Sequence, residues 1–582
     1  MMISRVVKYL IFLIPALIFL PQVSGQFYYG HQMTFGKNRV QYNNFYWYFY
    51  RYEDFDTYFN QQGKNLANYT ADYLSEEIAR VESFFDYELE NRLIFIIYNK
   101  LTDFRQSNIG LITGKEEYNT GGVTKIIRNK VFIYFDGDHK KFEEQISAAI
   151  TEVLINEMLY GNQLRENVTN STLIELPDWY LKGLISYVSK RWDIEIEDRV
   201  KDGILSNRYE KFNRLTGDDA IYAGHSFWRF IAENYGESVI PNILYLTRIN
   251  KNSNSGFLYV LGFSIKELSS EWMAYYMDLY DETRVDREFP EATKLFKRTN
   301  KKHVYTQVRI SPNGRYISYV TNELGQYKIW LYDTRENKAE KVFQHEHRLD
   351  QIPDHTYPVM NWHPTGRILT FFTEEEGGIK LYYYLLETGE LTSRNMIFYE
   401  KILDFSYSEN GLKMVISGIN RGQSDIYIHT LASGTNERIT MDIYDDFNPR
   451  FLSNGRQIIF SSNRPEDSTG FVQPGEPMNS KNLVKDLYIV DISFIGCFDY
   501  VEHPGVYAYH RCNHDGVGKI RVIRRTKEEL FILIRYFLGH TKTGNTRFRE
   551  HLVGYLSGRT CRSSFASGAT KDGESKYCTC HQ

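Results

Sequence analysis

A short turn motif recurs four times along the chain, and its spacing constrains the fold more than any other feature. The motif spans Ser311–Arg315, His363–Arg367, Ser408–Leu412 and Leu452–Arg456. Its glycines, Gly314, Gly366, Gly411 and Gly455, lie 52, 45 and 44 residues apart. Each motif precedes two strand-like runs rich in aromatic and β-branched residues. A period near 45 residues with several strands per unit is typical of β-propeller blades.

The four repeats predict an incomplete all-β propeller of about four blades over residues 296–493. Unrelated hairpins in a β-sandwich are the alternative, which the regular period disfavours. In the first repeat Asn313 and Gly314 form the centre of the motif. Both residue types tolerate a positive φ, so we expect a type I′ turn between two strands.

The first 25 residues predict a secretory signal peptide. A basic start at Arg5 and Lys8 precedes an apolar run over 9–20, then Pro21, and small residues end at Gly25. The apolar run is short for a membrane span, so cleavage near Gly25 is expected; an uncleaved anchor is the alternative. The later sequence holds no second long apolar run, so the mature chain is expected to lack a transmembrane segment.

Residues 26–290 precede the repeats and show mixed helix and strand patterns. Residues 26–90 are rich in aromatic residues and end in a helix-like pattern from residue 69. Residues 91–290 begin with a buried strand over 93–98, followed by a hairpin over 123–135 and a helix after Asp138. The region reads as α+β, with a small sheet followed by helices.

Composition excludes little but is consistent with several domains. The chain has 582 residues, enough for two to four domains, and a formal net charge of -4. So small a charge does not indicate a nucleic-acid binder. Aromatic residues make up 15% of the chain, including 46 Tyr. They suit half-buried strand faces, and they leave a glycan-binding surface as an alternative.

Two helical segments between residues 150 and 187 carry the pattern that bears most on function. The first contains Thr151-Glu152-Val153-Leu154-Ile155, and the second contains Pro177, Trp179, Lys182, Gly183 and Tyr187. In spacing, both resemble the peptidase-MA-like group of gluzincins. That group carries His-Glu-x-x-His on one helix and Pro-x-Trp-x-x-Glu-Gly-x-x-x-Tyr on the next. The resemblance implies a zincin-like domain, and the later Gly224-His225-Ser226 fits its Gly-x-Ser segment.

The departures from that pattern decide the predicted chemistry. In the family, two histidines and a glutamate bind zinc; here Thr151, Ile155 and Lys182 stand in their places, and Glu152 alone matches the general base. A catalytic zinc site needs three protein ligands. The sequence therefore predicts a degenerate peptidase domain with no catalytic residue, metal or cofactor. We expect Glu152 and Lys182 either to pair across the former cleft or to be separately solvated.

The repeats resemble the TolB-like, WD40-like (PD40) propellers of Gram-negative periplasmic proteins. Together the two resemblances imply an exported, periplasmic binding or scaffold protein, whose partner is another envelope protein or a polymer and not a nucleic acid. An active zinc metallopeptidase with other ligands is one alternative. A glycan-binding protein is another.

Other candidate residues are weaker. His345-Glu346-His347 is expected in a loop between blades. All five cysteines, Cys497, Cys512, Cys561, Cys578 and Cys580, lie near the end of the chain, in an atypical tail over 494–582 of possibly different origin. Together with His510, His514 and His581, they match no standard zinc-finger spacing. Three glycosylation sequons, at Asn68, Asn167 and Asn170, are incidental in a bacterial protein.

Overall fold

The computed structural model describes residues 40–107, 125–127, 129–160, 176–282, 299–300, 302–348, 354–453, 455–464, 485–491, 498–503 and 506–511. The chain divides into two units, residues 1–522 and residues 523–582, and every described residue belongs to the first. The predicted signal peptide and all five cysteines lie outside the described residues.

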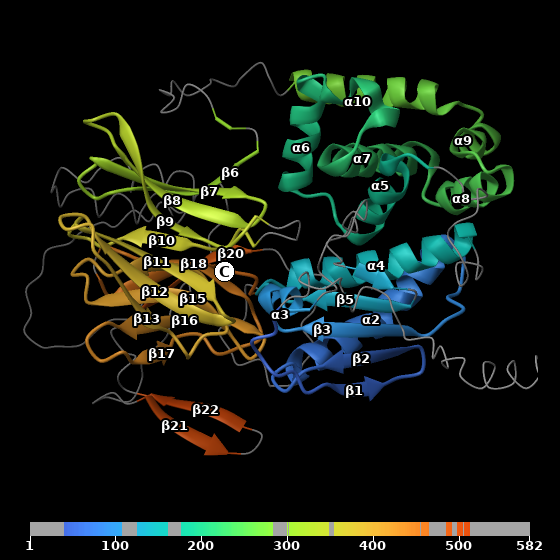
Figure 1. Cartoon of the computed structure of the whole chain (residues 1–582). Coiled ribbons are helices and arrows are strands. Elements are labelled where there is room, and N and C mark those ends of the chain that lie inside the picture. The colour runs from blue at the N-terminus through green and yellow to red at the C-terminus, as the bar shows by residue number, and fades with distance from the viewer. Residues whose placement is uncertain are drawn as a thin grey trace, which may run out of the picture. The chain divides into compact units, whose positions relative to one another are not determined.

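A five-stranded mixed sheet forms the first part of the fold (Figure 1). Its strand order is β1-β2-β3-β5-β4, with bounds Tyr48–Arg51, Phe55–Phe59, Leu93–Tyr98, Lys130–Tyr134 and Lys125–Ile127. Strands β2, β3 and β5 are parallel, whereas β1 and β4 pair antiparallel at the two edges. The predicted strand over 93–98 and the hairpin near 130 are both present. Residues 48–59, from the aromatic-rich segment, also belong to this sheet.

Helices α2 (Lys64–Phe85) and α4 (His139–Tyr160) cover one face of the sheet. Alternate strand residues such as Phe95 and Ile133 point to this face and join one large core. The short helix α3 (Leu101–Arg105) packs with Tyr98 and Phe132 in a separate small cluster. Since Phe132 alternates with core residues along β5, this cluster lies on the opposite face.

A helical layer continues the same core. It consists of α5 (Asp178–Ser189), α6 (Ile194–Leu205), the short 3-10 helix η3 (Arg208–Arg214), α7 (Gly217–Tyr235), α8 (Val239–Asn250), α9 (Ser253–Leu261) and α10 (Ile265–Glu282). Helix α5 packs on α4 and α7. No helix within the described ranges has the length and apolar character needed to cross a membrane.

Four successive β-sheets follow, each with its strands in chain order. Blade 1 holds β6 (Val304–Ile310), β7 (Tyr316–Glu323), β8 (Gln326–Asp333) and β9 (Lys338–His345). Blade 2 holds β10 (Val359–Trp362), β11 (Ile368–Glu375), β12 (Gly378–Leu385) and β13 (Leu391–Asn395). Blade 3 holds β14 (Lys401–Tyr407), β15 (Lys413–Asn420), β16 (Gln423–Thr430) and β17 (Asn436–Arg438). Blade 4 holds β18 (Asp446–Phe451), β19 (Gln457–Ser462) and β20 (Asp486–Asp491).

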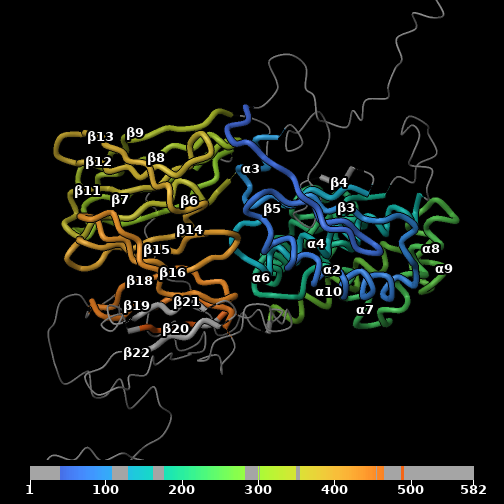
Figure 2. Tube along the Cα trace, turned by 90° about the horizontal axis from the view of Figure 1, so that it is seen from below, coloured from blue at the N-terminus to red at the C-terminus, as the bar shows by residue number. Residues whose placement is uncertain are grey.

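The four sheets confirm the predicted partial propeller. Figure 2 shows their colour passing from yellow-green in blade 1 to orange in blade 4. The inner strands contact one another in chain order, β6 with β10, β10 with β14 and β14 with β18. Three apolar clusters fill the spaces between consecutive blades. In the tail, β21 (Phe498–His503) and β22 (Val506–Arg511) form a separate two-stranded sheet.

The predicted turn type is wrong for the repeated motif. Gly314, Gly366, Gly411 and Gly455 have φ values between 63° and 71°, but Asn313 and Asn410 are not in the positive-φ region. A type I′ turn needs a positive φ at both central residues, and Pro312 fixes φ near −65°. The type I′ signature lies instead at the next connection of blades 1 to 3, where Leu324-Gly325, Glu376-Gly377 and Arg421-Gly422 have two successive positive φ values.

Candidate functional site

The middle of α4 carries Thr151, Glu152 and Ile155, the first three positions of the resemblance. Thr151 is fully buried, and its hydroxyl donates a hydrogen bond of 2.8 Å to the Ser147 carbonyl one turn earlier. Ile155 is 1% exposed and belongs to the main apolar core. Thus the two positions at which the family has histidine are used here for helix packing.

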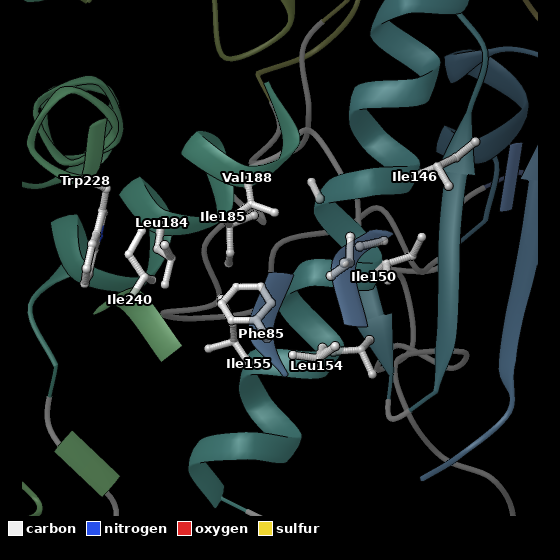
Figure 3. Close-up of a cluster of buried hydrophobic side chains, with 14 of the residues drawn as sticks. Phe85, Ile146, Ile150, Leu154, Ile155, Leu184, Ile185, Val188, Trp228 and Ile240 are labelled. Atoms are coloured by element: carbon white, nitrogen blue, oxygen red, sulfur yellow. The ribbon is translucent and has the colours of Figure 1, made fainter. Parts of the chain in front are cut away.

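Apolar side chains fill the space between α4 and α5. Figure 3 shows Ile155 of α4, Ile185 of α5 and Phe85 of α2 within one apolar cluster. Zinc in proteins is bound by thiolate, imidazole or carboxylate groups. The side chains that occupy this space do not supply them, so the residues present do not fit a metal. Across the described ranges, no three His, Cys, Asp or Glu side chains gather into a group able to hold a metal ion.

Lys182 occupies the position of the third family ligand. Its Nζ lies 3.1 Å from Asp178 Oδ2, one turn earlier on α5. This i,i+4 pair is partly exposed, and such pairs contribute little to stability. The positive charge of Lys182 also lowers the pKa of Glu152 on the neighbouring helix α4.

Glu152 is the one retained member of the family machinery. Burial raises the pKa of Glu152 to about 8, and the positive charge of Lys182 opposes that rise. Its Oε2 atom is buried without a hydrogen-bond partner. A carboxylic acid with this pKa is mostly protonated at neutral pH. Glu152 could thus exchange a proton, although the zinc ligands beside which the family's general base acts are replaced here by Thr151, Ile155 and Lys182.

Helix packing explains why Trp179 and Gly183 occupy their positions in the second motif. A Cβ atom on Gly183 would lie 2.4 Å from the Gly224 Cα, and one on Gly224 would lie 2.3 Å from the Trp179 carbonyl oxygen. The two glycines therefore let α5 and α7 cross in direct backbone contact. Trp179 is fully buried, and its Nε1 donates to Asn213. The spacing of this motif is required by helix packing, whether or not chemistry is present.

A serine and a histidine meet between α5 and α7, which the sequence did not predict. Ser186 Oγ and His225 Nδ1 are 3.0 Å apart, and both residues are buried. Burial, with repulsion from Lys190 and Arg229, lowers the pKa of His225 to about 3. The rings of Tyr187 and Trp192 contact the imidazole. Both side chains are about 1% exposed, and the hydrogen bond between them joins the two helices.

The carboxyl ends of β3 and β5 carry a set of largely buried charges that pair with charges of the propeller. Lys401 of blade 3 is 1% exposed, and its Nζ lies 2.7 Å from Asp136 and 3.1 Å from Asp354. Burial alone would lower the pKa of Lys401, but the two carboxylates raise it above its usual value. Lys401 therefore stays charged and holds two acidic groups from different parts of the chain.

Further ion pairs join the same two parts. His139, the first residue of α4, bonds to Asp445 through both its backbone N–H, at 2.8 Å, and its Nδ1, at 2.7 Å. Lys100 Nζ lies 2.5 Å from Glu374. Lys485 Nζ lies 2.5 Å from Asp138. Ligands of open sheets commonly bind beyond the carboxyl ends of parallel strands. Here propeller side chains occupy that edge.

The weaker sequence candidates lie away from the middle of α4. His345 ends β9, and its ring packs beside Tyr327, while the Glu346 carboxylate lies 3.9 Å from Arg105. Asn68 lies within α2, where the neighbouring Thr70 is buried. The sequons at Asn167 and Asn170 and the Cys/His set from position 512 onward lie outside the described residues.

Comparison with known proteins adds solved structures of low similarity. No family model and no curated protein matches the sequence. TolB from Acinetobacter baumannii is 16% identical over 36% of this chain and 44% of that chain, with a TM-score of 0.26. A putative TolB from Agrobacterium tumefaciens is 16% identical over 33% of this chain and 78% of that chain, with a TM-score of 0.21. The tricorn protease is 17% identical over 32% of this chain and 17% of that chain, with a TM-score of 0.22.

Likenesses with TM-scores this low establish nothing about function. The match also spans less than half of the Acinetobacter TolB chain. The assignment of four propeller blades therefore rests on the four sheets and their apolar contacts. Together with the sheet and its helices, they define a multi-domain protein in which an α/β part precedes a partial propeller.

Proposed function

We propose that this chain is an exported, periplasmic binding or scaffold protein whose peptidase-like domain is catalytically inactive. One observation carries the proposal: the space between α4 and α5, where the family binds zinc, is filled by the apolar core. A zincin-like domain without its ligands can keep its fold, because packing depends on the apolar faces of its helices.

Three positions support this proposal together. Thr151 bonds back to its own helix, Ile155 is buried among apolar groups, and Lys182 pairs with Asp178. Imidazoles at the first two positions would have to displace packed side chains. The variant Thr151→His/Ile155→His/Lys182→Glu is therefore expected to lose stability, although the helix pattern alone suggests tolerance.

The propeller supplies the binding role in this proposal. Apolar clusters lie between consecutive blades, and turn glycines such as Gly314 and Gly455 lie at the surface. Loops on a rigid scaffold are where binding residues concentrate. The proposed partner is another envelope protein or a polymer.

A broad peptide-library assay, run with and without added zinc, tests the inactive-domain proposal. We expect no cleavage above that of the Glu152→Gln variant under either condition. Cleavage that needs zinc and disappears in Glu152→Gln would overturn the proposal and favour an active metallopeptidase.

Exposed aromatic residues favour glycan binding as a second candidate. Tyr46, Trp47, Tyr48 and Phe49 are each more than a third exposed and lie at or beside the edge strand β1. Aromatic faces stack on the apolar faces of sugars in the same manner as on other ligands. Retention on immobilised glycans that is lost in Trp47→Ala, and kept in Tyr245→Ala on α8, would support it. Equal retention of the two variants, or none by the wild type, would exclude it.

A further inference from the structure

Exposed apolar side chains gather on helices α8 and α9 and on the turn that follows α9. Each of the five is between 39% and 66% exposed, and they are Tyr245, Ile249, Leu258, Tyr259 and Phe263. From residue 53 to residue 244, by contrast, Ile194 is the one large apolar side chain that is similarly exposed among the described residues. Single exposed apolar residues are ordinary, whereas a group of them indicates a surface that binds something.

The packing of the domain does not use these five side chains. Helix α8 buries its opposite side, which carries Ile240, Ile243, Leu244 and Thr247. Helix α9 meets α8 in close contact at Gly256, where a Cβ atom would lie 2.3 Å from Thr247 Oγ1. Figure 1 shows the two helices side by side at one end of the helical layer. Tyr245 and Ile249, which are four residues apart, therefore point away from the core.

The same segment carries positive charge and no negative charge. Residues 238–266 contain Arg248, Lys251 and Lys266 but no Asp or Glu, although the formal net charge of the whole chain is -4. The three cations are exposed. Exposed aromatic and aliphatic side chains beside Lys and Arg are typical of helices that lie on an anionic membrane surface.

We propose that α8, α9 and the turn after α9 dock this protein on an anionic lipid surface. The occupant is lipid because cations without neighbouring acids in the segment complement anionic headgroups. Tyrosine rings and aliphatic groups can enter the headgroup region, while Arg248 and Lys251 extend toward the lipid phosphates. The helices would lie in the interface and not cross the bilayer. This docking is separate from the binding role proposed for the propeller and does not depend on it.

Flotation of the full chain with lipid vesicles tests the proposal. We expect the wild type to float with vesicles of phosphatidylglycerol and phosphatidylcholine in equal parts, and to bind phosphatidylcholine alone much more weakly. Ile249→Glu should weaken binding to the anionic vesicles about tenfold or more, because an anion replaces an apolar contact. Arg248→Gln/Lys251→Gln should weaken it roughly fivefold for each cation removed.

A matched control separates this surface from apolar exposure in general. Ile397→Glu makes the same substitution at a 96% exposed position between blades 2 and 3, and it should bind the anionic vesicles as the wild type does. Every variant has the same first 25 residues, so any contribution of their apolar run is equal in all of them. Thermal unfolding should be unchanged in these variants, because each substituted side chain is exposed.

A wild type that does not bind the anionic vesicles would overturn the proposal, including the case in which a protein or a glycan covers this surface. Equal binding by the wild type and Ile249→Glu would also overturn it, as would an equal loss in Ile249→Glu and Ile397→Glu. Equal binding to both kinds of vesicle would contradict the role of the cations.

Discussion

Helix α4 has two regions of opposite character. Its first turn, with His139 and Glu143, is buried among charged and polar groups, and His139 bonds to Asp445 of the propeller. Its middle, with Thr151 and Ile155, is buried among apolar side chains of the same domain. The chemistry-bearing groups of the helix therefore lie where the sheet joins the propeller, and not where the peptidase resemblance expects them.

The two regions of α4 are stabilised by different interactions. Buried charges are stable when each has a partner, and they become costly when one partner is lost. Packed apolar groups lose stability in proportion to the volume that is removed. If α4 serves packing and the joint with the propeller, substitutions in both of its regions should lower the free energy of unfolding strongly. If its middle lined an open cleft, substitutions there would change the free energy of unfolding only slightly.

Loss of the Lys401 charge should have the largest effect. In Lys401→Ala, the buried Asp354 and the partly exposed Asp136 would lie near each other without the cation that now pairs with both. We expect the free energy of unfolding to fall by about 3–5 kcal/mol, measured by chemical denaturation. Lys380→Ala, which breaks the more exposed pair with Glu375, should change it by less than about 1 kcal/mol. Equal effects in the two variants would mean that the joint is not held by buried charge.

Shortening Ile155 should have the next largest effect. Ile155→Ala leaves a cavity in the core between α4 and α5, with an expected loss of about 2–5 kcal/mol. The control Ile249→Ala, on the exposed face of α8, should stay within about 0.5 kcal/mol of the wild type. A loss below about 1 kcal/mol for Ile155→Ala would indicate an open site at the middle of α4.

The first turn of α4 should make stability depend on pH. Burial raises the pKa of Glu143 from 4.5 to about 7, opposed by its hydrogen bond from Tyr69 and by His139. Burial lowers the pKa of His139, but Asp445 outweighs this and raises it above 6.5. Both groups bind protons more tightly when folded, so their stabilisation is complete below about pH 4.5 and is lost as the pH rises through about 7.

The expected loss of stability between those pH values is on the order of 2 kcal/mol. Denaturation curves across this range check it. Besides Tyr69 and His139, the charged or titratable groups near Glu143 include Glu77 and Asp445. Glu143→Gln should flatten the curve. A curve of unchanged slope in that variant would assign the pH dependence to other groups.

Removal of the Lys182 charge should have the smallest effect. Lys182→Met breaks the partly exposed pair with Asp178, and we expect a change below about 1 kcal/mol in thermal or chemical unfolding. The pKa of Glu152 should rise further, because the charge that lowers it is gone. A loss similar to that of Lys401→Ala would show that Lys182 acts as a structural cation.

Local sequence patterns predicted many of the observed strands and helices. The strand over 93–98, the hairpin near 130, the helix after Asp138 and the blades each follow from short-range periodicity. The turn type failed because Pro312, within the motif, fixes its own φ. The joint between sheet and propeller could not be predicted, because Lys401 and Asp136 are 265 residues apart. The position of Asp136 directly after a predicted strand was the available signal in the sequence.

The candidate site was predicted by position but not by environment. Spacing located Thr151, Glu152, Ile155 and Lys182 on two packed helices, which the structure contains as α4 and α5. It did not indicate that apolar side chains fill the space between them, because those come from α2 and from other turns of the same helices. The Ser186–His225 pair was also missed, since nothing in the spacing distinguishes it from two core residues.

The zinc content of the purified wild-type chain tests the central claim most directly. After dialysis against zinc-containing and then zinc-free buffer, elemental analysis should find far less than one zinc per chain. Ile155 and its apolar neighbours leave no place for three ligands. A tightly held zinc near one per chain, whose removal by a chelator also lowers stability, would contradict the account.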